Sequence, residues 1–159
     1  MQLLSFTIGD AEYAVESRRV VELLPLVTPR PVPHLPAHVA GVFTHRGRLV
    51  PLVDMAKLLG GPPLRPRLGT RVMVVDADPA QGPAGRLGMA AENVLTIRSA
   101  TLGPSVPPPL ANPLAAYLGP LLRLDGRTIQ LIAVEHLLTA GIAAAAAPAA
   151  PGTAVPGPA

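Results

Sequence analysis

The sequence predicts a mainly β fold in which two small five-stranded barrels pack against each other, each closed by a short helix. Short apolar runs of strand length recur along the chain, separated by glycine, proline and aspartate. One pattern of hairpin and helix occurs twice. A chain of 159 residues can bury one substantial core but hardly two independent ones, so the two units should share a hydrophobic seam. Barrels are favoured because closure removes the exposed edges of short antiparallel strands.

The first copy of the pattern lies between residues 36 and 61. Two apolar runs of strand type are joined by a turn whose glycine suits a positive φ: Val42–His45, Arg46-Gly47 and Arg48–Val53. Asp54 is suited to accept hydrogen bonds from free backbone N–H groups at a helix start. Met55–Leu59, followed by two glycines, is then expected to form a short helix.

The pattern recurs 79 residues later. GRLVPLVDMAKLL, from Gly47 to Leu59, aligns with GRTIQLIAVEHLL, from Gly126 to Leu138. The Gly-Arg pair, one central leucine and the closing Leu-Leu pair are identical, and apolar positions match. Asp125-Gly126 is the clearest hairpin turn in the chain. Agreement at turn, strand and helix indicates two copies of one unit.

Further strands are expected at Gln2–Ile8, Glu12–Val15, Val20–Leu24, Thr70–Val75, Arg86–Ala91, Val94–Ile97 and Leu118–Leu124. The hairpin of Thr70–Val75 and Arg86–Ala91 should stand in the second half where Leu3–Val15 stands in the first. Proline-rich connectors cover Pro25–Pro36 and Ser99–Pro113. We therefore expect one domain over residues 1–141. Its barrels should draw roughly on residues 15–65 and 66–141, and an alanine- and proline-rich tail, 142–159, should be disordered.

Composition limits the classes of function. Cysteine is absent, which excludes disulfides and thiolate chemistry and is compatible with a reducing cytoplasm. The first nine residues lack the positive segment of a signal peptide, so export is not expected. The longest uncharged run, Ser99–Leu122, contains six prolines and is better interpreted as a loop than as a membrane span.

The net charge of +3 leaves a nucleic-acid-binding module as the alternative function. Arg65, Arg67 and Arg71 form the one local basic cluster, within a proline-rich segment. They could contact phosphates, or they could belong to a solvated linker. With two Phe, two Tyr and no Trp to stack on bases, the linker interpretation is favoured.

No catalytic or cofactor motif stands out. No serine lies in a Gly-x-Ser-x-Gly context and no phosphate-binding loop is present. Asp76 and Asp78 are more simply turn formers than an acid pair. His34 and His38 have a spacing that suits a metal on a helix, but Pro36 breaks that helix. We therefore expect a non-catalytic protein without cofactor or metal, which acts by binding partners.

Four segments carry a family resemblance: F-x-I-G-x-x-x-Y-A-V from Phe6, V-V-E-L-L from Val20, V-A-G-V-F-x-x-R-G-x-x-V-P-L-V-D from Val39, and L-L-G from Leu58. Together they resemble the CheW domain, the scaffold of bacterial chemosensory arrays, over Met1 to about Gly141. The resemblance implies SH3-like barrels. Two runs, Phe43-Thr44-His45 before Arg46 and VVELLPLV from Val20, resemble the adaptors of surface-sensing (Wsp-type) clusters more than those of swimming chemotaxis.

The resemblance implies a chemotaxis adaptor in two-component signal transduction. It would join the cytoplasmic hairpin tip of a chemoreceptor to the regulatory domain of a CheA-like histidine kinase, in the cytoplasm at receptor arrays on the inner face of the membrane. A detached kinase regulatory domain acting as a competitor is a further possibility. Motif position places Val20, Gly41 and Arg46 at the receptor surface, and kinase-contact residues cannot be carried over.

Each of these three residues also has a purely structural interpretation. Val20 could belong to the core, since alternation along its strand points either Val20 or Val21 outward. Gly41 could let a receptor helix approach closely, or it could simply meet the geometry of a turn. Arg46 offers donors to a carboxylate or a helix-end carbonyl, or it is a solvated hairpin residue. His45 beside it could make receptor contact sensitive to pH.

Overall fold

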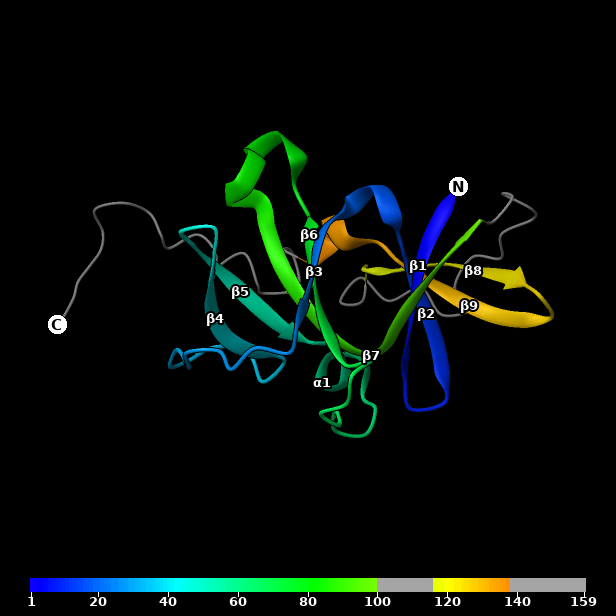
Figure 1. The fold of residues 1–159 in the computed structure, drawn as a ribbon, viewed down its shortest axis with the longest axis horizontal. Coiled ribbons are helices and arrows are strands. Elements are labelled where there is room, and N and C mark those ends of the chain that lie inside the picture. Colours follow the sequence, from blue (N-terminus) through cyan, green and yellow to red (C-terminus); the bar gives the residue numbers. More distant parts are fainter. Residues whose placement is uncertain (100–115, 138–159) are drawn as a thin grey trace, which may run out of the picture.

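The computed structural model describes residues 1–99 and 116–137, which are mainly β-strands (Figure 1). In chain order the elements are β1 (Gln2–Ile8), β2 (Ala11–Glu16), the 3-10 helix η1 (Ser17–Arg19), β3 (Val20–Pro25), β4 (Val39–His45), β5 (Arg48–Asp54), α1 (Met55–Leu59), β6 (Arg71–Asp76), the 3-10 helix η2 (Pro79–Gly85), β7 (Arg86–Ser99), β8 (Leu118–Leu124), β9 (Arg127–Ile132) and the 3-10 helix η4 (Val134–His136). The expected tail, 142–159, and nearly all of the second connector lie outside the described residues.

The strands form two five-stranded units of identical topology, which confirms the predicted fold class. The first barrel has the order β3-β6-β7-β5-β4, and the second has the order β7-β1-β2-β9-β8. In both, the first three strands are antiparallel, the next pairing is parallel, and an antiparallel hairpin completes the unit. Strand β7 belongs to both barrels and runs from one to the other (Figure 1).

The first hairpin of each half of the chain joins the barrel of the other half. The β6–β7 hairpin occupies in the first barrel the position that β1–β2 occupies in the second, as expected for a repeated unit. However, β6–β7 pairs with β3 and β5, and β1–β2 pairs with β7 and β9. Strand pairing therefore adds residues 71–91 to the barrel expected at 15–65, and residues 2–16 to the barrel expected at 66–141.

The prediction of separate strands at 86–91 and 94–97 was wrong, because β7 is continuous from Arg86 to Ser99. The polar pair Glu92-Asn93 marks a bend rather than a break. Asn93 has a φ of 51°, and the register between β1 and β7 shifts between Ser5 and Thr7. Asn93 Nδ2 donates a hydrogen bond to Thr7 Oγ1 at 2.7 Å. A bulge of this kind lets one strand turn from the first sheet into the second.

The local predictions for the repeated unit are confirmed. Both hairpin turns have positive φ at their two central residues, 51° and 78° at Arg46-Gly47 and 51° and 77° at Asp125-Gly126. The Asp54 side chain accepts a hydrogen bond from the Lys57 N–H at 3.1 Å, which caps α1. In the second copy the helix is the single 3-10 turn η4.

One hydrophobic core joins the two barrels. Its largest cluster draws on strands of both, and includes Phe6, Val15, Met55, Met73, Leu87, Met89, Ile132, Val134 and Leu137. Two smaller clusters lie one in each barrel, around Phe43, Val50 and Val72 in the first and around Leu3, Leu122 and Ile129 in the second. Because most of the buried apolar surface is shared, each barrel stabilises the other.

Candidate functional site

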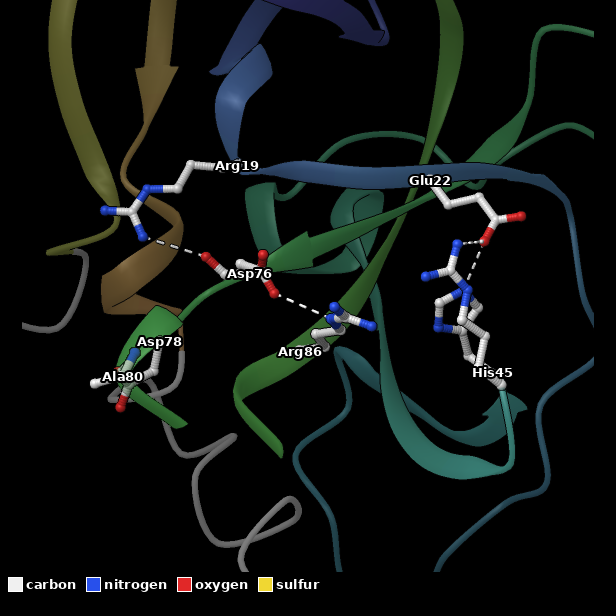
Figure 2. A network of polar contacts seen from close by, with 8 residues as sticks. Arg19, Glu22, His45, Asp76, Asp78, Ala80 and Arg86 are labelled. Carbon is white, nitrogen blue, oxygen red and sulfur yellow. Dashed lines mark hydrogen bonds and ion pairs between the residues drawn. The ribbon is translucent and has the colours of Figure 1, made fainter. Parts of the chain in front are cut away.

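Arg46 and Val20 are linked through one acid on β3. Val20 begins this strand and is half-buried against the shared core. Two residues later, Glu22 Oε1 accepts a hydrogen bond from Arg46 Nη2 at 3.2 Å and lies 2.8 Å from His45 Nε2. Both partners come from the β4–β5 hairpin, so this cluster ties β3 to β4, the outer strands of the first barrel (Figure 2).

The three members of this cluster differ in exposure. His45 is buried, with 6% of its side chain exposed, whereas 60% of the Arg46 side chain is exposed. The hydrogen bond from His45, with the charge of Arg46, outweighs desolvation and holds the pKa of Glu22 below its usual range. Glu22 is thus an anchored carboxylate that orients Arg46 while leaving most of its guanidinium open to solvent.

The backbone that comes close to Gly41 belongs to the same chain. It is buried on β4 with a φ of 143°, and a Cβ built there would lie 2.2 Å from the carbonyl oxygen of Arg30. Next to it, Val42 and Arg30 exchange two backbone hydrogen bonds of 2.8 and 3.0 Å. Glycine at this position therefore lets the proline-rich connector lie against β4. In this structure the connector, and not a receptor helix, occupies the space beside Gly41.

A second polar network lies where the barrels meet. Arg19 Nη1 donates to the Asp76 carbonyl at 3.2 Å, and Arg19 Nη2 lies 3.9 Å from a carboxylate oxygen of Glu135. Arg86 Nε donates to Asp76 Oδ1 at 3.1 Å (Figure 2). Arg19 thereby connects η1, β6 and η4. Asp78 instead accepts from the Ala80 N–H at 3.1 Å, which confirms it as a turn former.

Between the two networks is a basic hollow of about 310 Å³. Its lining residues are His45, Arg46, Arg48, Val50, Pro83 and Arg86. Three of them are arginines and none is acidic. Glu22 and Asp76, which pair with Arg46 and Arg86, do not line the hollow. The hollow can therefore present several N–H donors to a carboxylate or to the carbonyl end of a helix.

The described residues contain no group of three or more His, Asp or Glu side chains arranged to hold a metal ion. Within the same residues, none of the helices is long and apolar enough to cross a membrane.

Comparison with known proteins assigns the chain to a family. A family model described as the CheW-like domain matches residues 2–141. The chain belongs to the CheW-like domain family.

Curated CheW-like relatives extend over most of the chain. It is 30% identical over 139 residues to a probable chemotaxis protein CheW from Rhizobium etli, covering 87% of each chain. It is 28% identical to the chemotaxis protein CheW of Rhizobium meliloti, covering 86% of each. Protein FrzA of Myxococcus xanthus is 31% identical over 117 residues, which cover 72% of this chain and 69% of FrzA.

A solved CheW structure has the same fold. The scaffolding protein TtCheW from Thermoanaerobacter tengcongensis superposes with a TM-score of 0.73 at 18% identity, covering 86% of this chain and 91% of TtCheW. Family and relatives together identify the chain as a chemotaxis-type adaptor, and they do not support the nucleic-acid-binding alternative. CheW-like proteins are scaffolds and adaptors, in keeping with a non-catalytic role. The Wsp-type assignment stays a prediction.

Sequence reasoning singled out Val20, Gly41 and Arg46 but missed Glu22, the residue that holds Arg46 in place. Glu22 was visible as the one acid within the apolar run Val20–Leu24. An acid in such a run usually has a partner, because burying an unpaired carboxylate is costly. Its partners, however, come from a hairpin more than twenty residues away, and nothing local indicates them.

Proposed function

We propose that this adaptor couples the cytoplasmic helical hairpin of a chemoreceptor to the regulatory domain of a CheA-like histidine kinase. The observation that carries the proposal is Arg46, which lines the basic hollow and is held by Glu22 with most of its side chain exposed. The adaptor would work in the cytoplasm, at receptor arrays on the inner face of the membrane.

On this proposal the receptor contacts the surface formed by Val20 and Arg46. An exposed, pre-oriented guanidinium can bind a receptor carboxylate or the carbonyls at a helix end without first losing much conformational freedom. Gly41 would contribute by keeping the connector folded against β4, beside the hairpin that carries Arg46. The kinase regulatory domain, which resembles CheW, would dock edge to edge on a barrel.

The test separates the two partners. Arg46→Glu should lower affinity for a receptor hairpin fragment by at least about tenfold, the usual effect of losing a hydrogen bond to a charged group, and should leave kinase binding unchanged. Arg123→Glu is the matched control, since this exposed arginine lies on the second barrel's hairpin. Equal loss of both bindings by a folded Arg46→Glu protein, or no loss of either, would contradict the site assignment.

A further inference from the structure

A groove at the far end of β3 is a separate surface. It has a volume of about 560 Å³ and is lined by Leu23, Leu24, Pro25, Leu26, Pro66, Arg67, Leu68, Thr70 and Arg71. One wall is the end of β3 with the residue that follows it, and the other is the loop before β6 with Arg71, the first residue of that strand. The groove shares no lining residue with the basic hollow, and Val20, Gly41 and Arg46 are not among its residues. It begins at Leu23, directly after Glu22, and extends away from the proposed receptor surface along β3.

Leu68 is the most exposed large apolar side chain in the described residues, at 94%, yet its loop is fixed. The Thr70 N–H donates to the Arg67 carbonyl at 3.0 Å, and Arg71 Nε donates to the Leu68 carbonyl at 3.2 Å. The Val94 N–H donates to the carbonyl of Gly69 at 3.0 Å, which attaches the loop to β7. These bonds hold Leu68 away from the core.

The base of the loop is anchored by Glu92, a buried residue of β7. Its carboxylate accepts from the Arg65 N–H at 3.0 Å and from Arg65 Nη2 at 3.1 Å. The Thr70 hydroxyl donates to the Arg65 carbonyl. A loop ordered in this way loses little conformational entropy when a partner binds to it, so less of the free energy gained by burying Leu68 is offset by ordering.

The groove combines apolar and basic side chains. Leu26, with 41% of its surface exposed, and Leu68 supply apolar contacts, and Arg67 and Arg71 add two positive charges. The nearby acid Glu92 is hydrogen-bonded to Arg65, and its charge also attracts Arg67. The positive charge of Arg71 and part of that of Arg67 therefore remain available to a partner. Such a surface is complementary to a segment that presents leucine-type side chains along one stripe and carboxylates beside it.

We propose that this groove docks an acidic amphipathic helix of a partner protein, with its apolar stripe on Leu26 and Leu68 and its carboxylates facing Arg67 and Arg71. A second copy of this chain fits poorly, because both copies would bring the same two arginines together and the net charge of each is +3. Nucleic acid fits poorly as well, since none of the lining residues is aromatic and could stack on a base.

The test uses a phage-displayed library of 16-residue peptides selected on the full-length protein. Selected peptides should combine Leu or Ile at helical spacing with Asp or Glu. Synthesised and fluorescently labelled, they should bind with affinity that falls as NaCl rises from 50 to 500 mM. Leu68→Gln should weaken binding about tenfold or more. The double variant Arg67→Glu/Arg71→Glu should also weaken binding about tenfold or more, and its remaining binding should no longer weaken as NaCl rises.

Leu49→Gln is the matched apolar control, because Leu49 is 71% exposed on the β4–β5 hairpin. Arg123→Glu is the matched charge control. Both should leave peptide affinity unchanged, as should Arg46→Glu, which separates this result from the outcome for the receptor surface. The proposal is overturned if no acidic helical peptide is enriched, if Leu68→Gln binds as well as the parent, or if the protein self-associates through Leu68 instead. Circular dichroism verifies that each variant is folded.

Discussion

Replacing Gly41 with alanine tests whether the connector packs against β4 as described. The added Cβ would lie 2.2 Å from the Arg30 carbonyl oxygen and 2.8 Å from its carbon. Unbonded contacts of this kind are about 3 Å or longer, so the connector would have to move by nearly 1 Å. Alanine would also have to adopt a φ of 143°, which L-residues rarely do.

Two contributions set the expected magnitude. Holding a non-glycine residue at this φ costs about 1–3 kcal/mol, and overpacking a closed site costs about 1–3 kcal/mol more. If the connector detaches instead, the two hydrogen bonds between Arg30 and Val42 are lost, at about 0.5–1.5 kcal/mol each. Either route predicts a loss of about 2–6 kcal/mol from the free energy of unfolding, a large share of the stability of a small domain.

Urea unfolding followed by circular dichroism measures this loss, with Gly126→Ala as the control. Gly126 also has a positive φ, 77°, but a Cβ there would meet nothing within 4 Å. The control should lose only the backbone contribution, about 1–2 kcal/mol. If the two variants are equally stable, the connector does not press on β4, and Gly41 remains available to an external partner.

Two further outcomes follow from buried contacts. Burial raises the pKa of Glu92, but the hydrogen bonds and the charge of Arg65 together outweigh it and hold that pKa below its usual range; the pKa of Glu22 is lowered as well. A lowered pKa means that the folded state favours the carboxylate. Its stabilisation is therefore complete above the ordinary glutamate value, near 4.3, and is lost as the pH falls toward the folded-state pKa. Urea midpoints measured from pH 7 to 3 should fall in acid, and less steeply for Glu92→Gln; parallel curves would contradict the contact with Arg65. Separately, Gly88→Ala would bring a Cβ to 2.7 Å from the Phe43 ring and should cost about 1–3 kcal/mol in thermal unfolding. Phe43→Leu in the same chain should recover part of this, and if it does not, the ring is not what limits the space.

Turns and helix ends were predictable from the sequence where one or two residues determine the local backbone conformation. Arg46-Gly47 and Asp125-Gly126 indicated hairpin turns because they combine a tolerated first residue with a glycine that accepts positive φ. Asp54 and Gly60 likewise marked both ends of α1. The repeat of this unit then indicated a barrel pair.

Contacts between distant segments were not predictable in the same way. The polar pair Glu92-Asn93 separated two expected strands, although it forms a bend within one strand. Nothing local indicates that the strand continues, because its pairing partner β1 lies at the other end of the chain. Which hairpin joins which barrel depends on pairing between the two halves of the chain. The role of Gly41 was equally hidden, since the Arg30 carbonyl that fills its space comes from a connector with no periodic pattern.

The exchange of first hairpins has a consequence for the chain as a whole. A polypeptide cleaved in the link between α1 and β6 would give two fragments with the same order of strands. Each fragment would carry the hairpin, here called the arm, that completes the barrel of the other. The protein is in this sense a swapped dimer within a single molecule. Because the link keeps the two fragments at high effective concentration, neither has to compete with another molecule for its missing arm.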